Sequence, residues 1–249
     1  MALLMNPVLE AQLSHRSIRQ YTDKAIDESL LHQLIQGAQG AASSSFIQAY
    51  SLVQVSNPDT RNKIATLAGG QKWVESAAEF LVICADLTRV EYCSVKQGLG
   101  TLEGQAEHFL AATVDAALMA QNLMLAAESE GLGAVFIGGI RNDPQQVTEL
   151  LSLPKQVYPV FGLCLGWPDA EPDLKPRLPV EVILHKEEYD QSRCKADVDT
   201  YDEQMQAYYE SRESNTRVSN WSEQTAAAVQ LKKREHLLSF LHSQGFNKK

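Results

Sequence analysis

The feature that most constrains the fold is a long apolar periodicity between Gly104 and Gly131. Small and apolar side chains recur there at helical spacing, and polar residues such as Asp115 and Gln121 interrupt the run. Such interruptions are typical of a core helix and not of a membrane span. We therefore expect a central helix that ends in a left-handed cap at Gly131. Its small-residue surface suits either a core or a subunit interface.

Shorter elements surround this helix in the sequence. Runs rich in β-branched and aromatic residues predict strands, and amphipathic stretches with capping residues predict helices. The predicted strands or extended segments cover 51–56, 79–86, 134–140, 157–168 and 181–185. The other predicted helices begin at Pro7, Asp27 and Pro144, cover 198–212, and close the chain with one helix from Asn220 to Gly245. Few connections have βαβ length, so the pattern predicts an α+β fold with helices on both sides of one sheet.

Length and charge limit the partners of the chain. No linker interrupts its 249 residues, so we expect one domain over 1–249, with a helical excursion from about 190 to 249. Acidic residues outnumber Lys and Arg by 31 to 22, which argues against nucleic-acid binding because that needs a dense basic surface. The apolar start, MALLMNPVLE, is too short for a signal peptide and lacks its basic region. We therefore expect a cytoplasmic protein without nucleic-acid or membrane partners.

Common metal and nucleotide motifs are missing from the sequence. The four cysteines lie far apart and the six histidines show no metal-ligand spacing, so we expect reduced, buried thiols and no metal ion. The segment GLGAVFIGG lacks the spacing and the acidic residue of a dinucleotide fingerprint. No P-loop, α/β-hydrolase or penicillin-binding motif occurs either.

Two clusters of cations remain as candidates for chemistry. The first contains His15, Arg16, Ser17 and Arg19, and the second contains Lys175 and Arg177 in the extended segment KPRLP. Guanidinium, ammonium and hydroxyl groups together suit a phosphate monoester, and the two clusters could clamp one phosphate. From the residues alone, a solvated basic turn is an equally good interpretation of each cluster.

Several runs, in the same order along the chain, resemble the nitroreductase superfamily. Within it, the chain is most similar to the branch of oxygen-insensitive NADPH nitroreductases and NADPH-flavin oxidoreductases. The resemblance covers about residues 7 to 246. It rests on the runs HRSIRQYTD, AASSSFIQAYS, AGGQKWVESAAEFLVICAD, VDAALMAQNLMLAAESEGLGAVFIGGIRN, FGLCLGWP, DLKPRLP and YDEQMQAYYESR.

This resemblance implies a nitroreductase-like α-β-α sandwich with a mixed, mainly antiparallel sheet and a C-terminal helical extension. It also implies a homodimer with FMN at the subunit interface. By similarity, His15 and Ser17 would meet the FMN phosphate together with Lys175 and Arg177. Arg16 would anchor that segment, and Arg19 would support the negative charge that develops at the N1/O2 edge of the flavin.

The resemblance implies further FMN contacts. Ser43 and Ser45 would reach the cofactor from the partner subunit, and Gln71 would bond the flavin ring. The backbone at Ile137, Gly138 and Gly139 would lie beside flavin N5, with a β-bulge as the alternative interpretation of the two glycines. Phe136 stands where many relatives have Tyr, so a phenolic hydroxyl is missing there.

The implied activity is two-electron transfer from NADPH to nitroaromatics, quinones or free flavins by a ping-pong mechanism, with no catalytic side chain beyond the flavin. Arg212 and Arg217 in YYESRESNTR would bind the 2′-phosphate of NADPH, although the residues alone would suggest solvated charges. Two alternatives are a non-catalytic FMN-binding redox sensor and a nucleic-acid-binding protein that uses LKKRE and HRSIR. The segment YYESRESNTR, which would bind NADPH, argues against the redox sensor, because a pure FMN-binding module would not need it. The net charge of −9 argues against a nucleic-acid-binding protein.

Overall fold

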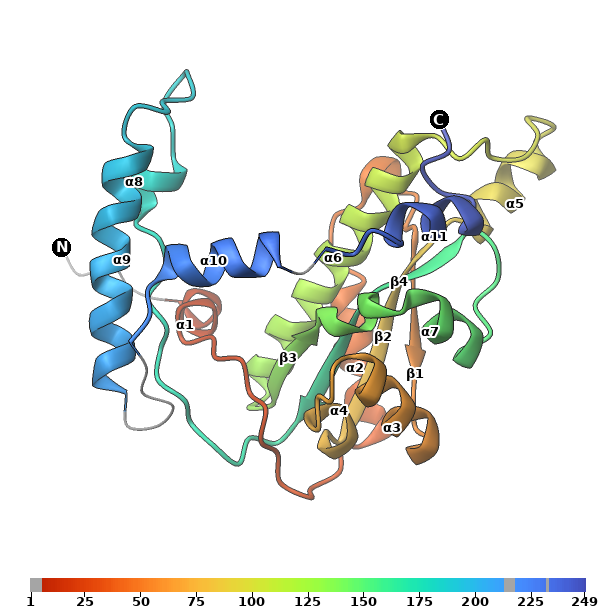
Figure 1. Ribbon diagram of the computed structural model, residues 1–249. Helices are drawn as coiled ribbons and strands as arrows, with labels where there is room; N and C mark the ends of the chain where they lie inside the picture. The colour runs from red at the N-terminus through yellow and green to blue at the C-terminus, as the bar shows by residue number, and fades with distance from the viewer. Residues whose placement is uncertain (1–5, 213–217, 232) are drawn as a thin grey trace. The chain divides into compact units, whose positions relative to one another are not determined.

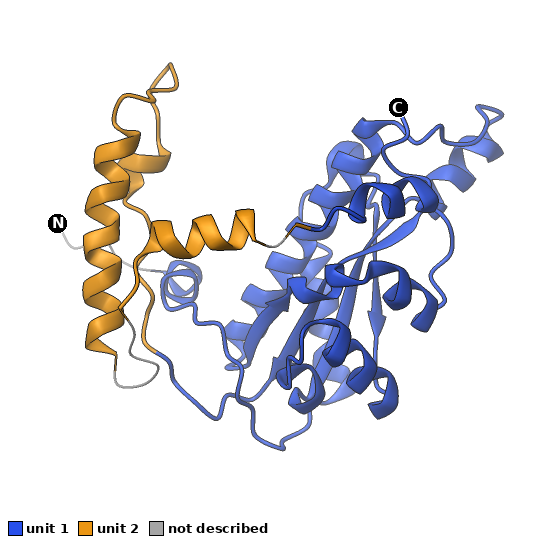
Figure 2. Ribbon diagram, in the orientation of Figure 1, with its two compact units in different colours: residues 1–172, 234–249 blue, residues 173–233 orange. Residues whose placement is uncertain are grey.

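The computed structural model describes residues 6–212, 218–231 and 233–249. Contacts divide the chain into two compact units (Figure 2). The first unit contains residues 1–172 together with 234–249, and the second contains residues 173–233. The end of the chain therefore belongs to the unit in which the chain begins.

One four-stranded sheet forms the centre of the first unit (Figure 1). Its strands are β1 (Tyr50–Gln54), β2 (Glu79–Asp86), β3 (Gly133–Ile137) and β4 (Val157–Gly166), in the order β1-β2-β4-β3. All three strand pairs are antiparallel. A parallel bridge joins Ser17 to Ala134 outside the named strands. The α+β class with a mainly antiparallel sheet is thus confirmed.

The alternation of side chains along β2 explains the layers on either face of the sheet. Leu81, Ile83 and Ala85 belong to one hydrophobic cluster, whereas Phe80, Val82 and Cys84 belong to another. Successive side chains of a strand point to opposite faces, so a continuous apolar run requires cover on both sides. The first face is covered by α2 (Glu28–Ala38), α6 (Ala106–Ser129) and α11 (Leu237–Gln244). The second face is covered by α3 (Pro58–Leu67), α4 (Trp73–Ser76) and α7 (Pro144–Leu150).

The central helix α6 ends as its sequence predicts. Gly131 has φ of +80°, and Leu132 N–H donates to the Ala127 carbonyl at 3.0 Å, so the left-handed cap is confirmed. Among the described helices, α6 is the one that is long and apolar enough to cross a membrane by length and composition. Its buried residues, among them Ala112 and Met119, lie in the sheet-facing core instead.

The first unit also contains shorter helices and turns. They are α1 (Pro7–Leu13), η1 (Ser44–Phe46), α5 (Thr88–Lys96) and η2 (Gly138–Asn142). The Asn6 side chain accepts hydrogen bonds from Val8 and Leu9 N–H, and Asp143 accepts one from Gln146 N–H at 3.0 Å. Both predicted helix starts, each followed by proline, are therefore confirmed.

The second unit contains α8 (Val180–Ile183), α9 (Cys194–Ser211) and α10 (Trp221–Gln230). Tyr201, Met205 and Tyr209 of α9 form its buried cluster. Two sequence predictions are wrong in this region. Residues 181–183 of the expected extended segment form part of the helical turn α8, and the expected last helix is divided into α10 and α11. The division follows from packing, because Phe240 and Leu241 of α11 are buried in the core of the first unit.

Candidate functional site

The segment that carries the first cation cluster is docked against the edge strand β3. Ile18 N–H donates to the Ala134 carbonyl at 3.0 Å. A Cβ atom at Gly133 would lie 2.5 Å from Ile18 Cγ1, so only glycine permits this close approach. The sheet therefore positions the residues on both sides of Ile18, from His15 to Arg19.

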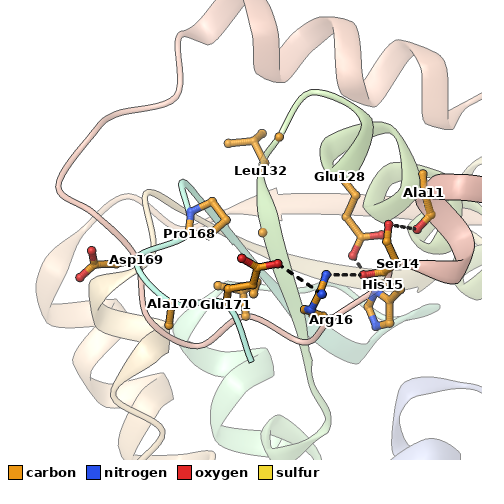
Figure 3. Close-up of a pocket in the computed structure, with 13 residues that line it drawn as sticks. Ala11, Ser14, His15, Arg16, Glu128, Leu132, Pro168, Asp169, Ala170 and Glu171 are labelled. Atoms are coloured by element: carbon orange, nitrogen blue, oxygen red, sulfur yellow. Dashed lines mark hydrogen bonds and ion pairs between the residues drawn. The ribbon is translucent and has the colours of Figure 1, made fainter. Parts of the chain in front are cut away.

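His15 and Arg16 line a cavity of about 570 Å³ beside this strand (Figure 3). Glu128, near the end of α6, and Glu171 also line it. His15 Nδ1 lies 2.5 Å from Glu128 Oε1, and Arg16 Nη2 lies 3.3 Å from Glu171 Oε1. The cavity thus holds two of the predicted cofactor ligands, each paired with a carboxylate.

Two observations support an anion-binding position at Arg16, although Glu128, Asp169 and Glu171 also line the cavity. The Arg16 Nε atom is buried and has no hydrogen-bond partner among the described residues. The carboxylate that pairs with Arg16 belongs to Glu171, whose side chain is 82% exposed. Exposed ion pairs contribute little, so a phosphate could displace Glu171 and satisfy the free donor.

Arg19 lies outside the residues that line the cavity and has different partners. Its Nη1 atom is 3.4 Å from the Ser17 carbonyl oxygen, and its guanidinium carbon is 5.6 Å from the ring centroid of Trp73. The cation–π contact places Arg19 beside the turn that precedes α4. Trp73 Nε1 is also buried without a hydrogen-bond partner among the described residues.

That same turn contains Gln71, which lies against the glycine pair. Gln71 Nε2 donates to the Ala68 carbonyl at 2.8 Å. A Cβ atom at Gly139 would lie 2.3 Å from the Ala68 oxygen and 2.5 Å from Gln71 Nε2. The structure therefore brings Gln71 and Gly139 together. Gly138 and Gly139 begin the 3₁₀ turn η2, so the β-bulge interpretation is wrong.

Phe136 and Ile137, just before the glycine pair, form the end of strand β3 and pack against its neighbours. Ile137 is fully buried, and its chain leaves β3 at that point. Phe136 is half-buried and makes an edge contact with Phe161, with the ring centroids 4.8 Å apart. The aromatic ring thus fills its position through packing against β4, without a hydroxyl.

Arg234 is a candidate site residue that the sequence did not reveal. Its Nη2 atom donates to the Gly138 carbonyl at 3.4 Å and to Asn142 Oδ1 at 3.0 Å. Nearby Arg141 donates to the Val160 carbonyl at 2.6 Å, and burial followed by the charge of Arg234 lowers the pKa of Arg141. In the sequence, Arg234 belongs to the charged run LKKRE, and no local pattern there indicates a contact with Gly138.

Ser43 is the N-cap residue of η1 and Ser45 lies within η1, and neither residue lines the cavity. Buried Asp115 of α6 holds this loop by accepting Ser44 N–H at 2.7 Å and Ala49 N–H at 3.1 Å. Ser45 has φ of +46°, in the left-handed region that is uncommon for serine. The two serines therefore sit on a constrained loop at a second location in the first unit.

Lys175, Arg177 and Arg212 belong to the second unit. The Lys175 Nζ atom lies 5.5 Å from the ring centroid of Tyr209, and the Arg212 guanidinium lies 5.8 Å from that of Tyr208. Between Lys175 and Arg177, the Pro176 carbonyl accepts a hydrogen bond from Tyr201 Oη at 2.7 Å. Arg217 lies outside the described residues.

The cysteines divide into two kinds. Cys84 and Cys164 are buried, as expected, and burial raises the pKa of the Cys84 thiol to about 12. Cys93 and Cys194 are exposed, so the expectation of burial is wrong for these two. In the described part of the chain, no group of three metal-ligating side chains comes together.

Comparisons with known proteins agree with one another. The family model described as "Nitroreductase family" matches residues 13–167, and "Nitroreductase family, C-terminal domain" matches residues 175–249. The oxygen-insensitive NADPH nitroreductase of Salmonella typhimurium is 45% identical over 97% of this chain and 99% of its own. The NADPH-flavin oxidoreductase of Vibrio harveyi is 43% identical over 98% of this chain and 100% of its own. The solved structure of B. megaterium NfrA1 has a TM-score of 0.93 at 42% identity and covers 98% of this chain and 100% of its own.

Proposed function

This chain belongs to the nitroreductase family, and we propose that it uses FMN to transfer two electrons from NADPH to nitroaromatics, quinones or free flavins. The relatives are an NADPH nitroreductase and an NADPH-flavin oxidoreductase, so the chain is an oxidoreductase that uses a flavin and NADPH. The alternative of a non-catalytic redox sensor is not favoured, because the similar proteins are named as enzymes.

The observation that carries the choice of FMN is the donor set on one docked segment. At one end, His15 and the free Nε atom of Arg16 offer hydrogen-bond donors suited to a phosphate monoester. At the other end, Arg19 lies over Trp73, two residues from Gln71. A single ligand with a phosphate at one end and an electron-accepting ring, which becomes negatively charged on reduction, at the other fits this arrangement.

In this proposal each side chain has a separate task. When bound, FMN supplies the redox chemistry by taking a hydride from NADPH and passing two electrons to an acceptor, which predicts ping-pong kinetics. Arg19 would stabilise negative charge at the pyrimidine edge of the flavin, and the backbone at Gly138 and Gly139, which carries no side chain, would let the flavin ring approach closely. By the resemblance, Lys175 and Arg177 would supply further positive charge for the phosphate.

We also propose that the active protein is a homodimer. Ser43 and Ser45 lie on a loop away from the other candidate ligands, which supports a contribution to the site of the partner subunit. Leu110, Val114 and Leu118 recur at four-residue spacing on α6 and remain exposed. An exposed apolar stripe on a core helix supports burial against a second copy.

The absorbance spectrum of the purified protein tests the function. We expect flavin bands that bleach when NADPH is added without oxygen and return when a nitroarene or a quinone follows. Phosphodiesterase-free extraction and chromatography of the released flavin should identify FMN. Bands that NADPH does not bleach would contradict the proposed activity, whereas a colourless protein that binds no added FMN would contradict the cofactor.

The preference for NADPH over NADH tests the proposed role of Arg212. A guanidinium can bind the 2′-phosphate, which NADH lacks, so Arg212→Ala should raise the KM for NADPH about tenfold. The KM for NADH should stay the same. Arg193→Ala, which removes an exposed arginine at the other end of α9, provides the control. An unchanged ratio of the two coenzyme efficiencies in Arg212→Ala would remove this residue from the nucleotide site.

A further inference from the structure

We propose that Tyr201 is a positioning residue that fixes the Lys175–Pro176–Arg177 segment for phosphate binding through its hydroxyl group. This inference rests on the proposed function, because it concerns the phosphate of FMN. The hydroxyl of Tyr201 donates to the Pro176 carbonyl at 2.7 Å, a short and well-formed hydrogen bond. The acceptor lies between the two cations that would bind the phosphate.

The other contacts of the segment are weaker: Lys175 lies near the Tyr209 ring, and the adjacent Leu178 packs against the buried cluster of α9. Lys175 and Arg177 are exposed, and no helix or strand includes them. Pro176 lacks a backbone N–H, so its carbonyl is its one backbone group for hydrogen bonding. Fixing that carbonyl fixes the backbone from which both cationic side chains project.

Tyr201 is itself rigidly held. Its residue is 4% exposed, and its ring makes an edge contact with Trp221, with the centroids 5.6 Å apart. Burial raises the pKa of Tyr201 above its ordinary value, although the charge of Arg177 opposes this effect. The hydroxyl therefore stays protonated and remains a donor throughout the physiological pH range.

Tyr208 on the same helix provides a natural comparison. Its hydroxyl lies 3.5 Å from the Asp173 carbonyl, which is beyond the range of a well-formed O–H···O bond. The two tyrosines thus offer the same chemical change at one bonded and one poorly bonded hydroxyl.

The test compares FMN with riboflavin, which has the same ring and no phosphate, on the full-length apoprotein. Tyr201→Phe should weaken FMN binding about 3- to 10-fold, the effect of one hydrogen bond, and leave riboflavin binding unchanged. Tyr208→Phe should change neither. In a Lys175→Ala/Arg177→Ala background, Tyr201→Phe should have no further effect on FMN, because the groups through which it acts are gone.

A packing control separates the hydroxyl from the ring. Trp221→Phe alters the surroundings of the Tyr201 ring and retains the hydroxyl, so the ratio of FMN to riboflavin affinity should stay that of the wild type. A merely structural role of Tyr201 would instead lower both affinities together, or prevent Tyr201→Phe from folding. Either result overturns the inference.

The outcomes also distinguish the two proposals. If the wild-type protein binds FMN and riboflavin equally, the phosphate site of the proposed function is wrong, and the role of Tyr201 is wrong with it. If the wild-type protein binds FMN more tightly than riboflavin, and the ratio of the two affinities is the same in Tyr201→Phe, the proposed function stands. Only the role of Tyr201 is then overturned.

Discussion

At the scale of single residues, Gly139 shows how closely the backbone approaches its neighbours. A Cβ atom there would lie 2.3 Å from the Ala68 carbonyl oxygen, a backbone atom that side-chain movement cannot displace. Gly139→Ala should therefore lower the free energy of unfolding by about 1–3 kcal/mol and release flavin, because the 68–71 turn must shift. Urea denaturation and flavin fluorescence would measure the two effects.

Gly37→Ala is the matched control for this change. Gly37 lies inside α2, and no atom lies within 4 Å of an added Cβ. Alanine should stabilise the helix there by about 0.5–1 kcal/mol and leave the flavin content unchanged. A Gly139→Ala protein that behaves like Gly37→Ala would show that the close approach at Gly139 is unimportant.

At the scale of elements, Asp86 links β1, β2 and α5 through its carboxylate. It accepts hydrogen bonds from the hydroxyls of Ser51 and Thr88, each at 2.5 Å, and pairs with Arg89 at 3.0 Å. Burial alone would raise the pKa of Asp86, but these hydrogen bonds and the charge of Arg89 lower it overall. A carboxyl with a lowered pKa stabilises the folded state above its unfolded pKa of about 4. That stability is lost as the pH falls through the lower, folded value.

Asp86→Asn should therefore lower the free energy of unfolding at pH 7 by about 1–3 kcal/mol. Because this carboxyl can no longer be protonated, the free energy of unfolding of the variant should also fall less steeply below about pH 4 than that of the wild type. Urea midpoints measured from pH 7 down to pH 3 would record both effects. Asp23→Asn changes an exposed carboxyl and should leave the midpoint at pH 7 unchanged. An acid profile of Asp86→Asn that runs parallel to the wild-type profile would show that Asp86 contributes no pH dependence.

At the scale of the whole molecule, the exposed stripe Leu110–Val114–Leu118 predicts assembly. Burying each of these side chains contributes about 2 kcal/mol, so one charge in the stripe should disrupt a dimer. Leu118→Asp should sediment as a monomer and lose flavin, whereas Leu99→Asp, on a loop after α5, should remain a dimer. A flavin-loaded wild-type monomer in sedimentation equilibrium would contradict the proposed assembly.

Cytoplasmic location and the absence of a metal stay predictions.

Several features of this protein were determined by local sequence alone. The end of α6 at Gly131 and the starts of α1 and α7 depend on chemistry within a few residues, as the bonds of Asn6 and Asp143 show. The β-branched and aromatic residues of 79–86 likewise predicted a strand, and β2 forms there. The cations of the docked segment were visible for the same reason, since their residue types alone suit an anion.

Other features were decided only by the tertiary structure, because their partners lie far apart in the chain. Arg234 and Gly138 are separated by 96 residues, and His15 and Glu128 by 113, so no local pattern connects them. The break between α10 and α11 depends on where Phe240 and Leu241 are buried. Local propensity determines which residues begin and end an element, whereas burial against distant residues determines where the elements stop and which side chains meet.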